Sequence, residues 1–174
     1  MKEEGEAVVA QRLKRVPTIA GKLGREAGMK LSRMEDVGGV RAVLPDQDAA
    51  YRVARQLRRN WTITRFRDYV TEPKPDGYRA LHLINRNRGR LIEIQLRTPR
   101  QDSWANLVEK AVQLFPAIKS GSGPLEMREW LVASSEIWAF KDGSIDGLSA
   151  ARLDEIEGIL DRADTFMRRL LHES

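Results

Sequence analysis

The amino-acid sequence predicts an α/β protein of the α+β type, with a mixed β-sheet of about five strands flanked by helices and further helices toward the C-terminus. Two observations predict the sheet. Apolar, β-branched runs recur before Pro99, and two of them are joined by a short turn that contains Gly89. A third observation predicts the helices, because the apolar patterns after Pro99 have helical spacing.

The first part of the chain is predicted to form two extended segments and two helices. Pro17 suits the first turn of a helix, and Gly28 marks its end. The segment VGGVRAVL is typical of a buried strand, and Asp46 or Asp48 can cap the amphipathic helix that follows it. The predicted bounds, in chain order, are 8–14 (extended), about 17–26 (helix), 37–44 (strand) and 46–60 (helix).

The middle of the chain is predicted to contain a β-hairpin. YRALHLIN and RLIEIQLRT alternate apolar and polar residues on either side of the turn RNRG. The loop PKPDGYRALH, with two prolines and a glycine, precedes the hairpin. The predicted bounds are 61–70, 78–85 and 90–98 for strands, and about 100–115, 124–140 and 149–172 for helices.

Composition limits the possible functions. The 174 residues fit one domain, or one domain with a helical appendage, and we place the core at 1–118 and the extension at 119–174, at the break KSGSG. The net charge of +5 favours phosphate-rich partners, and the absence of cysteine excludes disulfides and thiolate metal sites. Without an apolar run of about 20 residues or an apolar leader, we expect a cytoplasmic protein with no membrane segment.

One face of the hairpin carries polar side chains that suit a nucleotide. On RLIEIQLRT, Glu93, Gln95 and Arg97 share a face. On YRALHLIN, we expect Tyr78 and His82 to share a face, about 13 Å apart. A ring to stack on, cations for phosphates and a base for a hydroxyl would then lie together, although a solvated sheet face is the commoner reading of such a strand.

A second carboxylate comes from MEDVGGVRAV, where Asp36 precedes the predicted strand. Local sequence supports a turn or cap role for Asp36 about equally well. Together with Glu93 it would provide oxygen ligands for Mg²⁺. In QRLK, Arg12 and Lys14 lie on one side of an extended chain, and Lys22 lies in the helix that follows.

Four segments in order resemble the synthetase domain of the RelA/SpoT family, the (p)ppGpp synthetases. They are RLKRVPTIAGKL, MEDVGGVRAV, RFRDYVTEPKPDGYRALH and IEIQLRT, and the resemblance runs in order from about Arg12 to Glu109, over half the chain. Their order and internal spacing carry the resemblance, because each motif alone is weak or moderate. The 174 residues leave no room for the hydrolase domain of long members, so we expect a small stand-alone alarmone synthetase.

The resemblance implies a nucleotidyltransferase-like fold and a pyrophosphokinase. Such an enzyme moves the β,γ-diphosphate of ATP to the 3′-hydroxyl of GDP or GTP and releases AMP. Glu93 and Asp36 would be the catalytic pair and the Mg²⁺ ligands, with Glu93 completing the metal site or acting as the base. The implied ATP-binding residues are Arg12 and Arg41, which would sandwich the adenine, and Lys14 and Lys22, which would hold phosphates. The implied acceptor-binding residues are Lys74, Tyr78, His82, Gln95 and Arg97.

The acceptor is the open question. Family members also include toxins that modify the 3′-CCA end of tRNA and are neutralised by an antitoxin, and others that use adenine nucleotides. Arginines on and around the hairpin favour RNA modestly: Arg65, Arg67, Arg86, Arg88 and Arg90. A catalytically idle binding module is disfavoured because both acids are present. The last helix carries an apolar seam, which predicts packing on the sheet or assembly into a homo-oligomer.

Overall fold

The computed structural model describes residues 7–14, 16–25, 28, 30–31, 34–35 and 37–172. The chain divides into two compact units. The sheet unit comprises Met1–Val70 with Ala80–Pro99, and the helical unit comprises Thr71–Arg79 with Arg100–Ser174. The bounds of these two compact units differ from the predicted core at 1–118 and extension at 119–174. That division stays a prediction.

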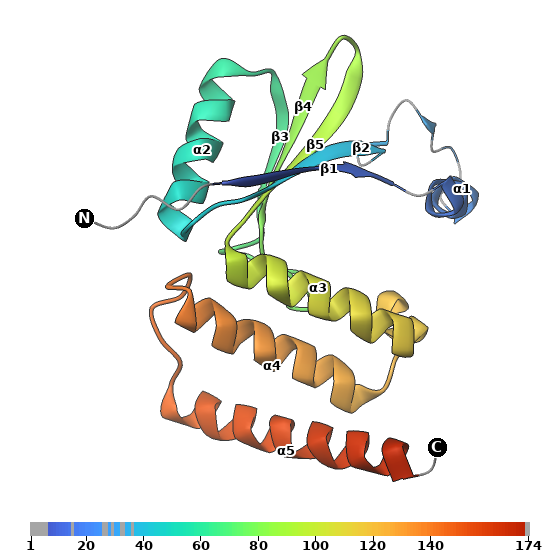
Figure 1. The fold of residues 1–174 in the computed structure, drawn as a ribbon, viewed down its shortest axis with the longest axis vertical. Coiled ribbons are helices and arrows are strands. Elements are labelled where there is room, and N and C mark those ends of the chain that lie inside the picture. The colour runs from blue at the N-terminus through green and yellow to red at the C-terminus, as the bar shows by residue number, and fades with distance from the viewer. Residues whose placement is uncertain are drawn as a thin grey trace. The chain divides into compact units, whose positions relative to one another are not determined.

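The sheet unit contains the predicted mixed sheet of five strands (Figure 1). Its order is β1-β2-β5-β4-β3, in which β2 and β5 are parallel and the other neighbours are antiparallel. The elements are β1 (Val8–Leu13), α1 (Val16–Arg25), β2 (Gly38–Val43), α2 (Gln47–Asn60), β3 (Ile63–Asp68), β4 (Leu81–Asn87) and β5 (Arg90–Arg97). The α+β prediction is confirmed.

Helix α2 covers one face of this sheet. Asp46 caps the helix, as predicted, because its carboxylate accepts a hydrogen bond of 2.7 Å from the Ala49 N–H. The buried alanines of α2 pack on apolar side chains of the strands, and this core contains Ala50, Ala54, Ala42, Leu81, Leu83, Ile94 and Leu96. The opposite face of β2, β4 and β5 therefore carries the polar residues that alternate with these.

The hairpin forms as predicted, but its first strand starts later. Strand β4 begins at Leu81, so Tyr78 lies in the preceding loop, and the prediction that Tyr78 and His82 share one strand face is wrong. The loop makes its own hydrogen bonds instead. The Tyr78 N–H donates to the Asp76 carboxylate (3.0 Å), and the Lys74 N–H donates to the Tyr78 carbonyl (3.1 Å).

The helical unit contains α3 (Pro99–Leu114), the 3-10 helix η2 (Pro116–Ser120), α4 (Leu125–Lys141) and α5 (Ala150–His172) (Figure 1). Trp104 of α3 is buried and donates its indole N–H to the Leu131 carbonyl (3.2 Å) and the Ser134 hydroxyl (3.1 Å) of α4. Ile156 and Ile159 of α5 pack with Ala133 of α4. The apolar seam of the last helix thus packs on α4. No helix in the described ranges is long and apolar enough to cross a membrane.

Candidate active site

The sheet register brings five of the eleven predicted site residues into two rows on the face opposite α2. Pairing along the first row joins Arg12, Gly39, Glu93, Ile84 and Arg65 across the five strands. Pairing along the second row joins Ala10, Arg41, Gln95, His82 and Arg67. The rows lie two residues apart on every strand, so their side chains share one face. We call this face the catalytic face.

Glu93 lies at the middle of the catalytic face and is held at both carboxylate oxygens. Its Oε1 lies 2.9 Å from Nδ1 of His82, and its Oε2 accepts a hydrogen bond of 2.7 Å from the Gln95 side-chain amide. Arg12 Nη1 lies 4.0 Å from Oε2. The carboxylate is therefore fixed in orientation by three neighbours on the two adjoining rows.

These neighbours also keep Glu93 ionised. Burial alone would raise its pKa, but the hydrogen bond and charge of His82 oppose burial, and Gln95 and Arg12 add to that effect. Their sum lowers the pKa of Glu93 from 4.5 to about 2. A carboxylate with such a pKa is an anion at any physiological pH.

Gln95 and Arg97 extend this network into the protein interior. Both residues are only 3% exposed. The Gln95 amide oxygen accepts a hydrogen bond of 3.2 Å from Arg97 Nη2, while its amide nitrogen donates to Glu93. A chain of hydrogen bonds thus runs from Arg97 through Gln95 to Glu93. Their predicted contact with the acceptor stays a prediction, and the hydrogen bonds described here are with protein groups.

Arg12 and Arg41 are spaced for an aromatic ring. Arg12 pairs with Gly39, and Arg41 lies two residues further along β2, so the two are diagonal neighbours on the catalytic face. Such neighbours are about 7 to 8 Å apart. A planar base between two guanidinium groups needs about twice the van der Waals contact distance of about 3.5 to 4 Å, so this backbone spacing is compatible with the predicted sandwich.

Three other predicted residues are described only in part or not at all. Lys14 follows β1, and its N–H donates to the Val37 carbonyl (3.0 Å) just before β2. Lys22 lies in α1, but its side chain is outside the described part of the chain. Asp36 is outside the described residues, so its convergence with Glu93 stays a prediction.

In the helical unit, the loop carries Lys74 and Tyr78 as an adjacent pair. The Lys74 ammonium lies 4.7 Å from the centre of the Tyr78 ring, a cation–π contact. Gly77 has a φ of 88°, and an added Cβ there would lie 2.9 Å from Cβ of Ser135 in α4. The loop can approach α4 this closely only because residue 77 has no side chain.

Glu35 is a residue that sequence reasoning did not select. Its carboxylate lies 2.7 Å from Arg65 and 3.8 Å from Arg67, both on the catalytic face. Part of the positive charge of the arginines on and around the hairpin is therefore balanced by the protein itself. The available signal was the position of Glu35 directly before the predicted metal ligand Asp36. Its position in the sequence does not, however, reveal the contact with β3.

Gly39 is a second residue that sequence reasoning missed. It lies opposite Glu93, and an added Cβ would lie 2.6 Å from the Glu93 carbonyl oxygen. That distance is shorter than real Cβ contacts, so β2 and β5 approach each other here in a way that only glycine allows. The double glycine of VGGVRAV was the signal for this close approach.

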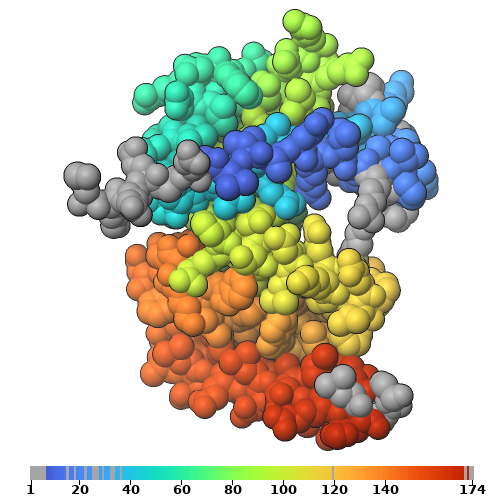
Figure 2. All heavy atoms as spheres, in the orientation of Figure 1, coloured from blue at the N-terminus to red at the C-terminus, as the bar shows by residue number. Residues whose placement is uncertain are grey.

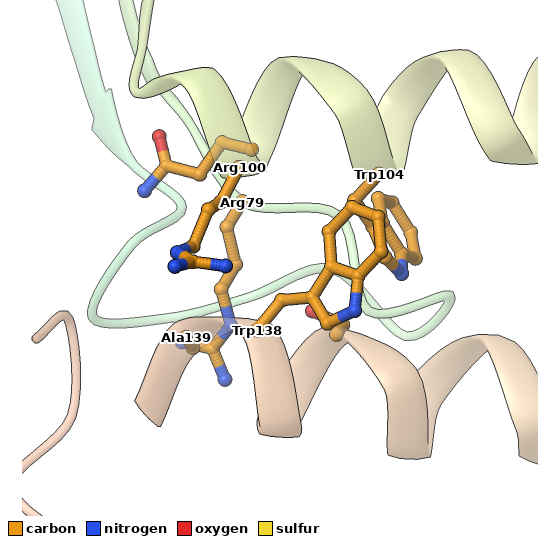
Figure 3. A pocket seen from close by; sticks show the side chains of 7 residues that line it. Arg79, Arg100, Trp104, Trp138 and Ala139 are labelled. Carbon is orange, nitrogen blue, oxygen red and sulfur yellow. The ribbon is translucent and has the colours of Figure 1, made fainter. Parts of the chain in front are cut away.

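A small pocket in the helical unit has basic and aromatic walls (Figure 3). Its lining residues are Arg79, Arg100, Gln101, Trp104, Ser135, Trp138 and Ala139. Burial lowers the pKa of Arg79, and the charge of Glu136 counteracts that effect. With a volume of about 10 Å³, the pocket has room for a single water molecule and cannot hold a nucleotide.

The chemistry of Glu93 fits Mg²⁺, which takes carboxylate oxygens, waters and substrate phosphates as ligands. Each carboxylate oxygen can accept about two hydrogen bonds. Oε1 has one close partner in His82 and Oε2 has one in the Gln95 amide, with Arg12 further away at 4.0 Å, so each oxygen keeps capacity for a further partner.

Fold and face together define a protein that binds nucleotides on a mixed sheet. The model of the region found in RelA/SpoT proteins matches residues 11–113. That match covers more than half of the chain, and the chain therefore belongs to the RelA/SpoT family. The resemblance inferred from the four motifs is confirmed.

Several relatives are known by name. The chain is 30% identical over 153 residues to the GTP pyrophosphokinase YwaC of Bacillus subtilis (strain 168), covering 79% of this chain and 70% of YwaC. Of the much longer GTP pyrophosphokinase rsh of Brucella ovis, the match covers only 13%.

Solved structures agree with this grouping. The small alarmone synthetase 2 from Bacillus subtilis has a TM-score of 0.65 at 29% identity, over 78% of this chain and 76% of that one. The small alarmone synthetase 1 from Bacillus subtilis, bound to its product pppGpp, has a TM-score of 0.65 at 25% identity, over 88% and 78% of the two chains.

Proposed function

We propose that this protein is an ATP-dependent pyrophosphokinase that makes (p)ppGpp from GDP or GTP. The observation that carries the proposal is the ionised Glu93 carboxylate, fixed by His82 and Gln95 at the centre of a face that also carries Arg12 and Arg41. Family membership supplies the reaction class, because relatives that cover most of this chain are named for this activity.

In the proposed reaction, the 3′-oxygen of the acceptor attacks the β-phosphorus of ATP. The bond from that phosphorus to the oxygen of the α-phosphate breaks, AMP leaves, and the hydroxyl proton is released. Transfer of this kind depends mainly on alignment and on neutralising charge, with little covalent work for the protein. Arg12 and Arg41 would hold the adenine of ATP, and Lys14 and Lys22 would hold the phosphates of ATP.

The low pKa of Glu93 argues against one of its two expected roles, that of a general base. A general base works best when its pKa is near the working pH, and a pKa of about 2 is far below it. We propose that Glu93 accepts a hydrogen bond from the 3′-hydroxyl and orients it, while the proton passes to solvent. Glu93 and Asp36 would hold Mg²⁺, which when bound neutralises charge on the phosphates.

The acceptor is proposed to be a guanine nucleotide. Tyr78 would stack on the base, and Lys74 and His82 would contact the phosphates. Glu35 already pairs with Arg65 and Arg67. This pairing removes part of the charge argument for tRNA as the acceptor.

The test is to incubate the protein and Mg²⁺ with γ-³²P-labelled ATP and, separately, GDP, GTP, unlabelled ATP or deacylated tRNA. We expect label in the guanine nucleotide products, and none with the Glu93→Gln variant as control. Label that appears only in tRNA, only in an adenine nucleotide, or in no acceptor would refute the proposal.

A further inference from the structure

Positive charge is concentrated in two segments of the sheet unit. Residues 49–67 and 83–92 contain nine arginines, no lysine and no acid. The whole chain has a net charge of +5, so all the other residues together carry a net charge of −4. The basic character of this protein therefore belongs to these two segments and not to its surface in general.

The fold brings the two segments together. The first segment includes most of α2 and continues into β3, and the second contains the turn between β4 and β5. The Arg86 N–H donates a hydrogen bond of 2.9 Å to the Thr62 carbonyl, and Ile63 pairs with Asn85. The C-terminal end of α2 and the hairpin tip are therefore neighbours, and both reach the surface in Figure 2, where α2 is teal and the tip is yellow-green.

Most of these arginines are available for a ligand. Arg65 and Arg67 pair with Glu35, and Arg58 lies over the ring of Phe66 at 4.9 Å. The remaining six are exposed, and within the described ranges of the chain they form no ion pair. We call these six the arginine surface: Arg52, Arg55, Arg59, Arg86, Arg88 and Arg90.

The arginine surface has a regular layout on the helix. Arg52, Arg55 and Arg59 are three and four residues apart, so they follow one face of α2 over about 10 Å. Trp61 follows α2 directly and is 53% exposed, one residue before the carbonyl that bonds to Arg86. An exposed aromatic side chain thus lies where the two arginine groups meet.

Arg88 has a backbone conformation that its residue type disfavours. Its φ is 48°, and it is the one non-glycine residue with positive φ among those that the structure describes. Gly89 follows with a φ of 76°, so the pair forms a two-residue hairpin turn. The first position of such a turn favours asparagine, aspartate or glycine. Among the described residues, the exposed Arg88 side chain has no hydrogen bond or ion pair that would offset this strain, and strained residues often serve function.

We propose that the arginine surface binds single-stranded nucleic acid, with guanidinium groups on successive phosphates and a base stacked on Trp61. Arginine pairs with phosphate in two-point geometry and also stacks on bases. A membrane surface fits less well, because Trp61 is the one large apolar side chain exposed in these segments as described. The site goes beyond the proposed reaction, since it uses none of the residues assigned to ATP or to the acceptor.

The experiment measures binding of fluorescein-labelled single strands, one of RNA and one of DNA with the same mixed sequence, by fluorescence anisotropy over a series of salt concentrations. Arg88→Asn removes one cation and relieves the strained turn. We expect a Kd about three- to tenfold weaker, a salt slope reduced by about 0.7, and a melting temperature at or above that of the unchanged protein. The ratio of the affinity for RNA to the affinity for DNA shows which of the two nucleic acids the arginine surface prefers.

Arg169→Gln is the matched control, because Arg169 is an exposed arginine of α5 in the helical unit. We expect its Kd to stay within twofold of the unchanged protein. If the two variants weaken binding equally, the loss comes from the lower net charge and not from the arginine surface, and the proposal is overturned. Failure to bind either strand, or tighter binding to phosphatidylserine vesicles than to both strands, would also overturn it. None of these results depends on pyrophosphate transfer.

Discussion

Replacing Gly39 by alanine should damage the catalytic face without touching a charged group. An alanine Cβ at this position would lie 2.6 Å from the Glu93 carbonyl oxygen, where real contacts are 3.0 Å or longer. Strand β5 must then move away from β2 by roughly 0.4 Å or more. Because both atoms belong to the strand backbones or are fixed to them, no side chain can rotate to relieve the clash.

The size of the effect follows from this displacement. Overpacking of this kind costs about 1 to 3 kcal/mol of folding free energy. A displacement of about 1 Å at a catalytic group can cost about a hundredfold in rate. A shift smaller than that should lower kcat about tenfold, and KM for ATP should change little because Arg12 and Arg41 remain.

The assay compares Gly39→Ala with Gly38→Ala, its neighbour on the same strand. A Cβ on Gly38 would meet only Cδ2 of Leu13, at an ordinary distance of 3.8 Å. Steady-state transfer kinetics and urea unfolding are measured for both. If Gly39→Ala has the same kcat as Gly38→Ala, the close approach of β2 to Glu93 does not position the carboxylate.

Three other predictions concern single side chains. The pKa of Glu93 is lowered from 4.5 to about 2, so its ionised form stabilises the fold above pH 4.5 and this contribution is lost as the pH falls toward 2. Urea titrations of the metal-free protein should show that Glu93→Gln loses less stability than the unchanged protein over that range, and equal losses would contradict the stabilising network. Gln95→Leu should lower kcat about tenfold at nearly constant KM, because it removes a hydrogen bond to Glu93; a raised acceptor KM at constant kcat would instead indicate direct acceptor binding. Tyr78→Ala should raise the acceptor KM about ten- to a hundredfold, whereas Tyr78→Phe keeps the stacking ring and should not; equal effects of the two changes would exclude stacking.

Much of the sheet unit follows from local sequence. Alternating residues and a glycine turn predict the hairpin at Gly89, and Asp46 caps α2 because its carboxylate can reach the Ala49 N–H. These features depend on residues close together in the chain. Glu93 could be selected for a similar reason. It alternates with the apolar residues of its strand, so local sequence alone places its carboxylate on the polar face.

The features that sequence reasoning missed depend on distant contacts. Tyr78 was assigned to a strand because its segment alternates, but Gly77 packs against Ser135, far along the chain, and the loop turns there. Gln95 and Arg97 alternate like exposed residues, yet they are almost fully buried. Neither the packing of Gly77 on Ser135 nor the burial of Gln95 and Arg97 leaves a periodic pattern in the sequence.

The most direct test of the account is the single-turnover rate of pyrophosphate transfer from ATP to GDP, measured at saturating nucleotide for the unchanged protein and for Glu93→Gln. The variant keeps the shape of the side chain but removes the negative charge at the centre of the catalytic face. We expect a loss of at least about a thousandfold in rate. A variant that transfers within tenfold of the unchanged protein would contradict the assignment of the reaction to Glu93.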